Sequence, residues 1–96
     1  MNSKDRAYLR GLANTIEPIF QVGKLGINDN LIKQVDDALE ARELIKLTVL
    51  ETAPNDAKDI AIVLGNNTNS VVVQVMGRKI TLYRKRVKDS KININV

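Results

Sequence analysis

Four consecutive residues, Gly23-Lys24-Leu25-Gly26, have the types and spacing best suited to binding a ligand. They lie between a run that favours a strand and a segment that favours a helix. Glycine has no Cβ, so the backbone of such a loop can approach a phosphate closely. The start of the next helix would add free N–H groups and a partial positive charge, and Lys24 would add a mobile cation. The pattern predicts a phosphate-binding loop, which we call the GxxG loop; a plain strand-to-helix turn would have the same spacing.

Other nucleotide-binding patterns and the usual catalytic groups are missing from the sequence. The GxxxxGK[ST] pattern of P-loops and the GxGxxG pattern of dinucleotide-binding folds do not occur. KH modules, in contrast, clamp the RNA backbone with a GxxG loop. The chain has no histidine and no cysteine, which removes the commonest general base and all thiolate metal ligands. We therefore expect a non-catalytic protein without a metal or a cofactor.

Charge is distributed unevenly along the 96 residues, whose net charge is +4. Residues 1–10 carry three cations and one anion, residues 29–59 four cations and eight anions, and residues 78–91 seven cations and one anion. Basic ends suit a polyanion such as nucleic acid, although a solvated surface with a basic tail would have the same composition. The candidate contacts are Lys4, Arg6, Arg10, Arg78, Arg84, Lys85 and Arg86.

Two further groups of side chains have alternative interpretations. Tyr83 precedes the last basic run and could stack on a base, or it could be a half-exposed strand residue. The acidic residues Asp36, Asp37, Glu40 and Glu43 spread around one helix at successive positions. We interpret them as a solvated helix face and not as a metal or acid–base site.

Seven elements are expected to position these residues. Apolar residues at helical spacing predict helices over 3–15, 28–43 and 56–64. Ser3 and Asn28 are the expected N-caps of the first two helices, and Gly65 is the expected C-cap of the third. Strands are predicted over 19–22, 44–51, 71–76 and 80–83. Gly77 and Arg78 would join the last two strands in a type II′ turn.

The order α-β-α-β-α-β-β predicts an α/β fold with a mixed four-stranded sheet packed by helices. Strands separated by helices favour parallel pairing, whereas the final hairpin must be antiparallel. The expected domain covers residues 1–86 and a basic tail covers residues 87–96. No apolar run is long enough to span a membrane and no signal peptide is visible, so we expect a cytoplasmic protein.

Several blocks of the sequence resemble the CRM domain, a family named after chloroplast RNA splicing and ribosome maturation. The similar blocks are residues 10–13, 23–26, 38–47, 73–78 and 82–84, in the order expected for stand-alone bacterial YhbY-like members. The resemblance implies a fold similar to the C-terminal domain of translation initiation factor three. Two positions differ from the family pattern: Asn14 stands where many members have His, and Asn28 where they have Thr or Ser.

The resemblance also implies a function. Bacterial members are associated with precursors of the large ribosomal subunit, and plant members assist group II intron splicing. We expect a monomer that binds ribosomal RNA through the GxxG loop and the candidate cations, with Tyr83 beside them. Two alternatives remain open: a DNA-binding architectural protein, and an interaction module whose acidic helix face docks a ribosomal protein.

Overall fold

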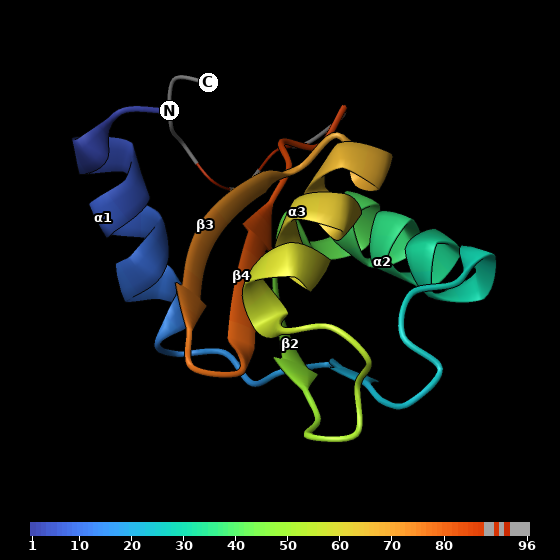
Figure 1. Cartoon of the computed structure of the whole chain (residues 1–96). Helices are drawn as coiled ribbons and strands as arrows, with labels where there is room; N and C mark the ends of the chain where they lie inside the picture. The colour runs from blue at the N-terminus through green and yellow to red at the C-terminus, as the bar shows by residue number, and fades with distance from the viewer. Residues whose placement is uncertain (88–89, 91, 93–96) are drawn as a thin grey trace.

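A computed structural model describes residues 1–87, Ser90 and Ile92. The elements follow one another as α1 (Ser3–Ala13), β1 (Phe20–Val22), α2 (Asp29–Arg42), β2 (Leu44–Val49), α3 (Ala57–Thr68), β3 (Val71–Met76) and β4 (Lys79–Tyr83) (Figure 1). The predicted α/β class and the predicted order of elements are confirmed.

The four strands form one mixed sheet in the order β1-β2-β4-β3. β1 is parallel to β2, while β4 is antiparallel to both β2 and β3. β4 therefore separates β2 from β3, although these two strands run in the same direction. This arrangement brings the carboxyl ends of β1 and β2 to the same end of the sheet as the β3–β4 turn, which we call the loop end.

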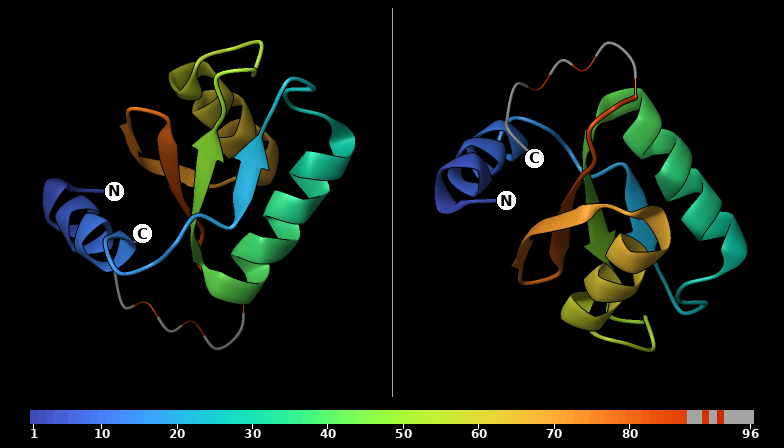
Figure 2. Two further views of the ribbon diagram at one scale, coloured as in Figure 1. Left: turned by 90° about the horizontal axis from the view of Figure 1, so that it is seen from below. Right: turned by 90° about the horizontal axis from the view of Figure 1, so that it is seen from above.

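Helices cover the two faces of the sheet unequally. α2 and α3 pack on one face over a core that includes Val35, Leu39, Ile60 and Leu64. α1 lies on the other side, as the view from below shows (Figure 2, left). There a smaller cluster joins two α1 residues to three sheet residues: Leu9, Ala13, Leu44, Val73 and Tyr83. The rest of this second face has no helix over it, and we call it the open face.

Side-chain caps start all three helices. The Asn28 side chain accepts a hydrogen bond from the Leu31 N–H at 2.8 Å, which confirms the predicted cap of α2. The cap of α1 is Asn2 and not Ser3, since the Asn2 side chain accepts from the Asp5 N–H at 2.8 Å. α3 begins after Asp56, whose side chain accepts from the Asp59 N–H.

The third helix is longer than predicted. α3 continues through Gly65 to Thr68, and Asn69 forms the left-handed C-cap with φ of 53°. Gly65 has a packing role instead of a capping one, because a Cβ there would lie 3.3 Å from the Ser70 carbonyl oxygen and 3.3 Å from Val72 Cγ2. The prediction of a loop from residue 66 onward was wrong, because Asn69 and not Gly65 adopts the left-handed conformation that ends the helix.

Glu43 was wrongly grouped with the exposed acidic residues, because its side chain is buried. It is the C-cap of α2 with φ of 66°, and its Oε2 accepts a hydrogen bond from the Ser90 hydroxyl at 2.8 Å. Ile92 packs against the small α1 cluster. These two residues of the predicted tail contact the domain; residues 88–89, 91 and 93–96 lie outside the described residues.

Candidate nucleic-acid interface

The GxxG loop is a tight turn at the loop end of the sheet. The Gly26 N–H donates to the Gly23 carbonyl oxygen at 2.9 Å, so Lys24 and Leu25 are the two central residues. Both side chains are exposed, and that of Leu25 is 80% accessible. An apolar side chain with this exposure adds nothing to the core, so its position is available for contact with another molecule.

Only one of the two loop glycines is required by the fold. Gly26 has φ of +64°, and a Cβ there would lie 3.0 Å from Pro54 Cγ in the β2–α3 connection. At Gly23 a Cβ would make only ordinary contacts, the nearest at 3.8 Å to Leu50. A side chain at Gly23 would therefore fit the folded chain but would cover backbone that is now accessible.

The loop leads directly into the amino terminus of α2. Asn28 caps this helix through the Leu31 N–H, and the remaining first-turn N–H groups supply partial positive charge close to the loop. Asp29, the first helical residue, is exposed at the same place and partly offsets that charge. Lys24 is the one full cation in the loop itself.

The open face carries two lysines, one of which lies at the loop end. Lys46 pairs with Thr81 across β2 and β4, and Thr48 pairs with Lys79 one step closer to the loop end. Lys79 is exposed, while the Lys46 ammonium lies 3.4 Å from the Ile16 carbonyl oxygen. Alternation along the strands directs all four side chains away from α2 and α3.

Lys46 and Lys79 were not among the predicted contacts, although a signal for Lys46 was present in the sequence. Ile45, Leu47 and Val49 alternate with Lys46 and Thr48, so one face of this strand had to be polar. The sequence did not reveal that α1 leaves this polar face uncovered, because the contacts that join α1 to the sheet are between residues far apart in the sequence.

Two of the three predicted α1 cations remain available at the surface. Lys4 and Arg10 are exposed. Arg6 instead serves the fold: its Nη1 donates to the carbonyl oxygens of Val72 and Val73, both at 2.7 Å, where β3 has an irregularity in register. Arg10 follows Arg6 by about one helical turn and lies on the same flank of α1.

Arg78 and the basic run after β4 lie at opposite ends of the sheet. Arg78 belongs to the β3–β4 turn at the loop end and pairs with Glu51 at 3.2 Å, with both side chains exposed. Arg84, Lys85 and Arg86 follow β4 at the other end, where Leu44 pairs with Tyr83. The expectation that the GxxG loop and both basic ends share one surface is therefore met by Arg78 but not by the run after β4.

Arg84 has partners within the protein. Its guanidinium pairs with the Asp36 carboxylate, donates to the Thr68 carbonyl oxygen at 2.8 Å and lies 3.6 Å from Glu40 Oε1. These contacts tie the end of β4 to α2 and α3, and only 19% of the side chain is exposed. Arg84 is thus a structural residue in this conformation, whereas Lys85 is exposed and Arg86 is half-buried.

Tyr83 is not placed to stack on a base, which corrects the prediction. Its side chain is only 1% exposed because α1 packs over this end of the sheet through Leu9 and Ala13. The exposed tyrosine is Tyr8, 48% accessible on the surface of α1.

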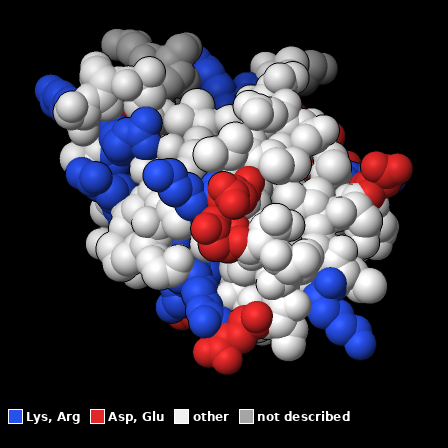
Figure 3. Space-filling view, viewed as in Figure 1, with Lys and Arg blue, Asp and Glu red and all other residues white. Residues whose placement is uncertain are grey.

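On the face of the molecule seen in Figure 3, positive and negative side chains are distributed unevenly. In this view the positive side chains lie mainly over α1 and near the β3–β4 turn, whereas acidic side chains lie mainly over α3 and towards α2. On this face, the charge separation along the sequence is therefore also a separation in space. The side with positive charge borders the open face.

The family model of the CRS1/YhbY (CRM) domain matches residues 1–84. The chain belongs to this family. The CRM domain thus spans all seven elements and ends one residue after β4.

Related proteins cover the chain almost completely. It is 44% identical to the Bacillus subtilis protein named "Probable RNA-binding protein YqeI", with 98% of each chain covered. It is 28% identical to a Haemophilus influenzae protein named "RNA-binding protein", covering 98% of this chain and 94% of that one. A solution structure from Staphylococcus aureus, described as "a putative RNA binding protein", has a TM-score of 0.82, 47% identity and 99% coverage of both chains.

Neither a cluster of metal ligands nor a membrane-spanning helix is found among the described residues. Among residues 1–87, 90 and 92, no three acidic side chains come together in a way that could hold a metal ion. No helix in that part of the chain has the length and apolar character needed to cross a bilayer.

Proposed function

We propose that this CRM domain is a non-catalytic RNA-binding protein that clamps the RNA backbone at the GxxG loop. The observation that carries the proposal is the position of this loop, whose exposed Lys24 and Leu25 lie at the loop end of an open face that carries Lys46 and Lys79. A sugar-phosphate chain over this region would meet accessible backbone at Gly23, helix N–H groups and three separate ammonium groups.

We further propose ribosomal RNA in precursors of the large subunit as the target, with the protein acting as a cytoplasmic monomer during assembly. Support comes from the CRM family, whose bacterial members are associated with these precursors, and from relatives named as RNA-binding proteins. The contacts of the proposed mode are to backbone charge and shape, which suits a structured RNA recognised without a long base sequence.

The GxxG clamp is tested by the double variant Lys24→Asp/Leu25→Asp. Both side chains are exposed, so the fold should survive, while two carboxylates would repel phosphate at the tip of the turn. We expect RNA affinity to fall by at least about tenfold, measured by fluorescence anisotropy with a labelled ribosomal RNA fragment. The control is Lys58→Asp/Ile62→Asp, which makes the same change in charge at two exposed positions of α3.

Equal losses in the two double variants would remove the GxxG loop from the mechanism, because net charge alone would then explain the effect. Circular dichroism of each variant establishes that it is folded.

The target is tested by crosslinking in cells followed by sequencing of the attached RNA. Enrichment of large-subunit precursor RNA is the expected result. Enrichment of other RNA classes would reject the proposed target. Preference for duplex DNA in a competition assay, or gradient co-sedimentation that survives nuclease treatment and high salt, would favour the DNA-binding or protein-docking alternative.

A further inference from the structure

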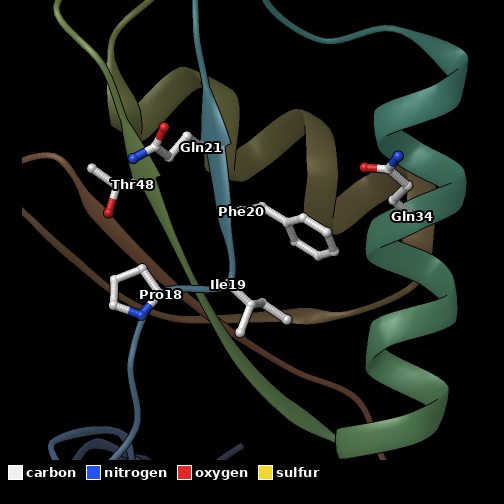
Figure 4. Close-up of a pocket in the computed structure, with 6 residues that line it drawn as sticks. All are labelled: Pro18, Ile19, Phe20, Gln21, Gln34 and Thr48. Atoms are coloured by element: carbon white, nitrogen blue, oxygen red, sulfur yellow. The ribbon is translucent and has the colours of Figure 1, made fainter.

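A groove runs along the free edge of β1, between this strand and α2, and reaches the open face at Thr48. It consists of two adjoining hollows of about 620 Å³ and about 390 Å³, which share Gln21 and Gln34 in their walls. The larger hollow is also lined by Pro18, Ile19, Phe20 and Thr48 (Figure 4). The smaller one continues to the GxxG loop and to Asn28, Asn30 and Leu31 at the start of α2.

The strand side of the groove offers unpaired backbone groups. In the sheet formed by the described residues, β1 has β2 as its only neighbour. The Val22 carbonyl oxygen accepts a hydrogen bond at 2.9 Å from the N–H of Leu50, the residue after β2, so the backbone of Val22 faces β2. Because successive residues of a strand direct their polar groups to opposite edges, Phe20 also faces β2, and the N–H and C=O of Gln21 point to the groove.

The side chains around the groove are mostly uncharged. Figure 4 shows the Phe20 ring extending from β1 towards α2 and the Gln34 amide extending from α2 towards β1. Gln34 is exposed and Phe20 is half-buried, so both can be reached from solvent. Lys24, at the loop, is the one charged residue in the lining of either hollow.

We propose that this groove binds bases of single-stranded RNA whose backbone is held at the GxxG loop, an inference that rests on the proposed function. A base has a flat apolar face and an edge of donors and acceptors, which correspond to the Phe20 ring and to the Gln34 amide with the β1 edge. The groove lacks the cations that a phosphate would need, whereas the loop at its end supplies one. Phosphate and base would thus be bound side by side.

An extended peptide is the other ligand that pairs with a free strand edge. β1 is only three residues long and offers too few edge groups for a continuous strand-to-strand ladder. The cation and free helix N–H groups at the end of the groove also suit a phosphate more than a peptide bond. The groove therefore favours RNA.

The test compares two single-stranded RNA probes of equal length, an oligouridylate and an abasic ribose-phosphate strand. The wild-type domain is expected to bind the base-bearing strand at least about tenfold more tightly, since one base contact of this kind is worth about that factor. In Gln34→Ala, this preference should fall by about threefold or more while affinity for the abasic strand stays unchanged. Alanine is a good helix former, so α2 should persist.

Asn66→Ala is the matched control, because it removes an exposed amide from α3, away from the groove. It should leave both affinities at their wild-type values. Equal binding of the two probes by the wild-type protein would overturn the proposal that the groove binds bases. An equal loss of preference for the base-bearing strand in Gln34→Ala and Asn66→Ala would overturn it as well. Neither result would contradict binding of the RNA backbone. Absence of binding to both probes would instead reject the proposed function. Displacement of the oligouridylate by an uncharged extended peptide would overturn RNA as the occupant.

Discussion

At the scale of single residues, the burial of Tyr83 affects the ionisation of its phenol. Among the described residues, its hydroxyl has no hydrogen-bond partner. Burial raises the pKa of the Tyr83 phenol above its ordinary value, and the nearby carboxylates of Glu43 and Asp5 raise it further. The folded state therefore favours the neutral phenol more strongly than the unfolded state does.

We predict that Tyr83→Phe changes the pH dependence of stability in alkaline solution. Below the unfolded pKa of about 10, the contribution of the raised pKa is fully present, and it is lost as pH rises through the folded pKa. The free energy of unfolding should therefore decline above pH 10 in the wild type and decline less in Tyr83→Phe. At pH 7 the variant should be equal or more stable by about 1 kcal/mol, because a buried hydroxyl without a partner is removed.

Urea denaturation followed by circular dichroism at pH 7 and at several values above pH 10 measures both effects. Tyr8→Phe is the control, since that ring is 48% exposed. An alkaline decline of the same size in Tyr83→Phe and in the wild type would contradict the assignment to Tyr83.

The sequence predicted single residues well where their role is local. Asn28 caps α2 as expected because a cap depends on residues three positions away. Tyr83 and Arg84 were interpreted incorrectly because their partners are distant in sequence: Leu9 covers the tyrosine and Asp36 binds the guanidinium. Alternation along a strand tells which face a side chain points to, but not what covers that face.

At the scale of elements, the hairpin illustrates both the strength and the limit of sequence patterns. The Gly77-Arg78 turn was predicted, and Gly77 has the positive φ of 60° that such a turn needs. The order of the strands was not predictable. β3 has four valines and yet lies at the sheet edge, whereas the less apolar β4 is central. Ile80 and Leu82 of β4 belong to the core under α2 and α3, and Tyr83 belongs to the cluster under α1.

At the same scale, replacing either of two helical glycines by alanine should change the free energy of unfolding, in opposite directions at the two positions. A Cβ at Gly11 would meet no atom of the described residues within 4 Å, whereas a Cβ at Gly65 would crowd the backbone oxygen of Ser70. Gly11→Ala should raise the free energy of unfolding by about 0.5–1 kcal/mol, since alanine is the better helix former. Gly65→Ala should lower it by up to about 2 kcal/mol, because the cost of crowding exceeds the same gain.

Urea denaturation of the two variants at neutral pH measures both changes. The pair controls itself, because the substitution is identical and both sites are helical. A stabilising Gly65→Ala would mean that Ser70 and Val72 move aside at little cost, and the explanation of why α3 passes through Gly65 would need revision.

At the scale of the whole molecule, the uneven charge of the sequence becomes two separate basic groups. One group surrounds the open face and the loop end and includes Lys24, Lys46, Arg78 and Lys79. The other follows β4 at the far end, where Arg84 is already paired with α2. The composition indicated a basic protein, but the partition depends on β4 running antiparallel to β2, which no local signal in the sequence encodes.

Only the group around the open face should contribute strongly to the salt dependence of RNA binding. Each phosphate neutralised on a single strand contributes about −0.7 to the slope of log affinity against log salt, so five contacts would give about −3.5. Lys46→Gln/Lys79→Gln removes two of the proposed contacts. Its slope should therefore be shallower by about 1.4, measured by anisotropy titrations with a single-stranded RNA across a range of salt concentrations.

Lys33→Gln/Lys58→Gln is the matched control, with the same net charge but with both substitutions on exposed positions of α2 and α3. Its slope should stay at the wild-type value, because counterions are released only where cations meet phosphate. If the two double variants gave the same slope, RNA would be responding to the total charge of the protein and the open face would have no special part. A shallower slope in Lys46→Gln/Lys79→Gln alone would locate the bound strand on the face that α1 leaves uncovered.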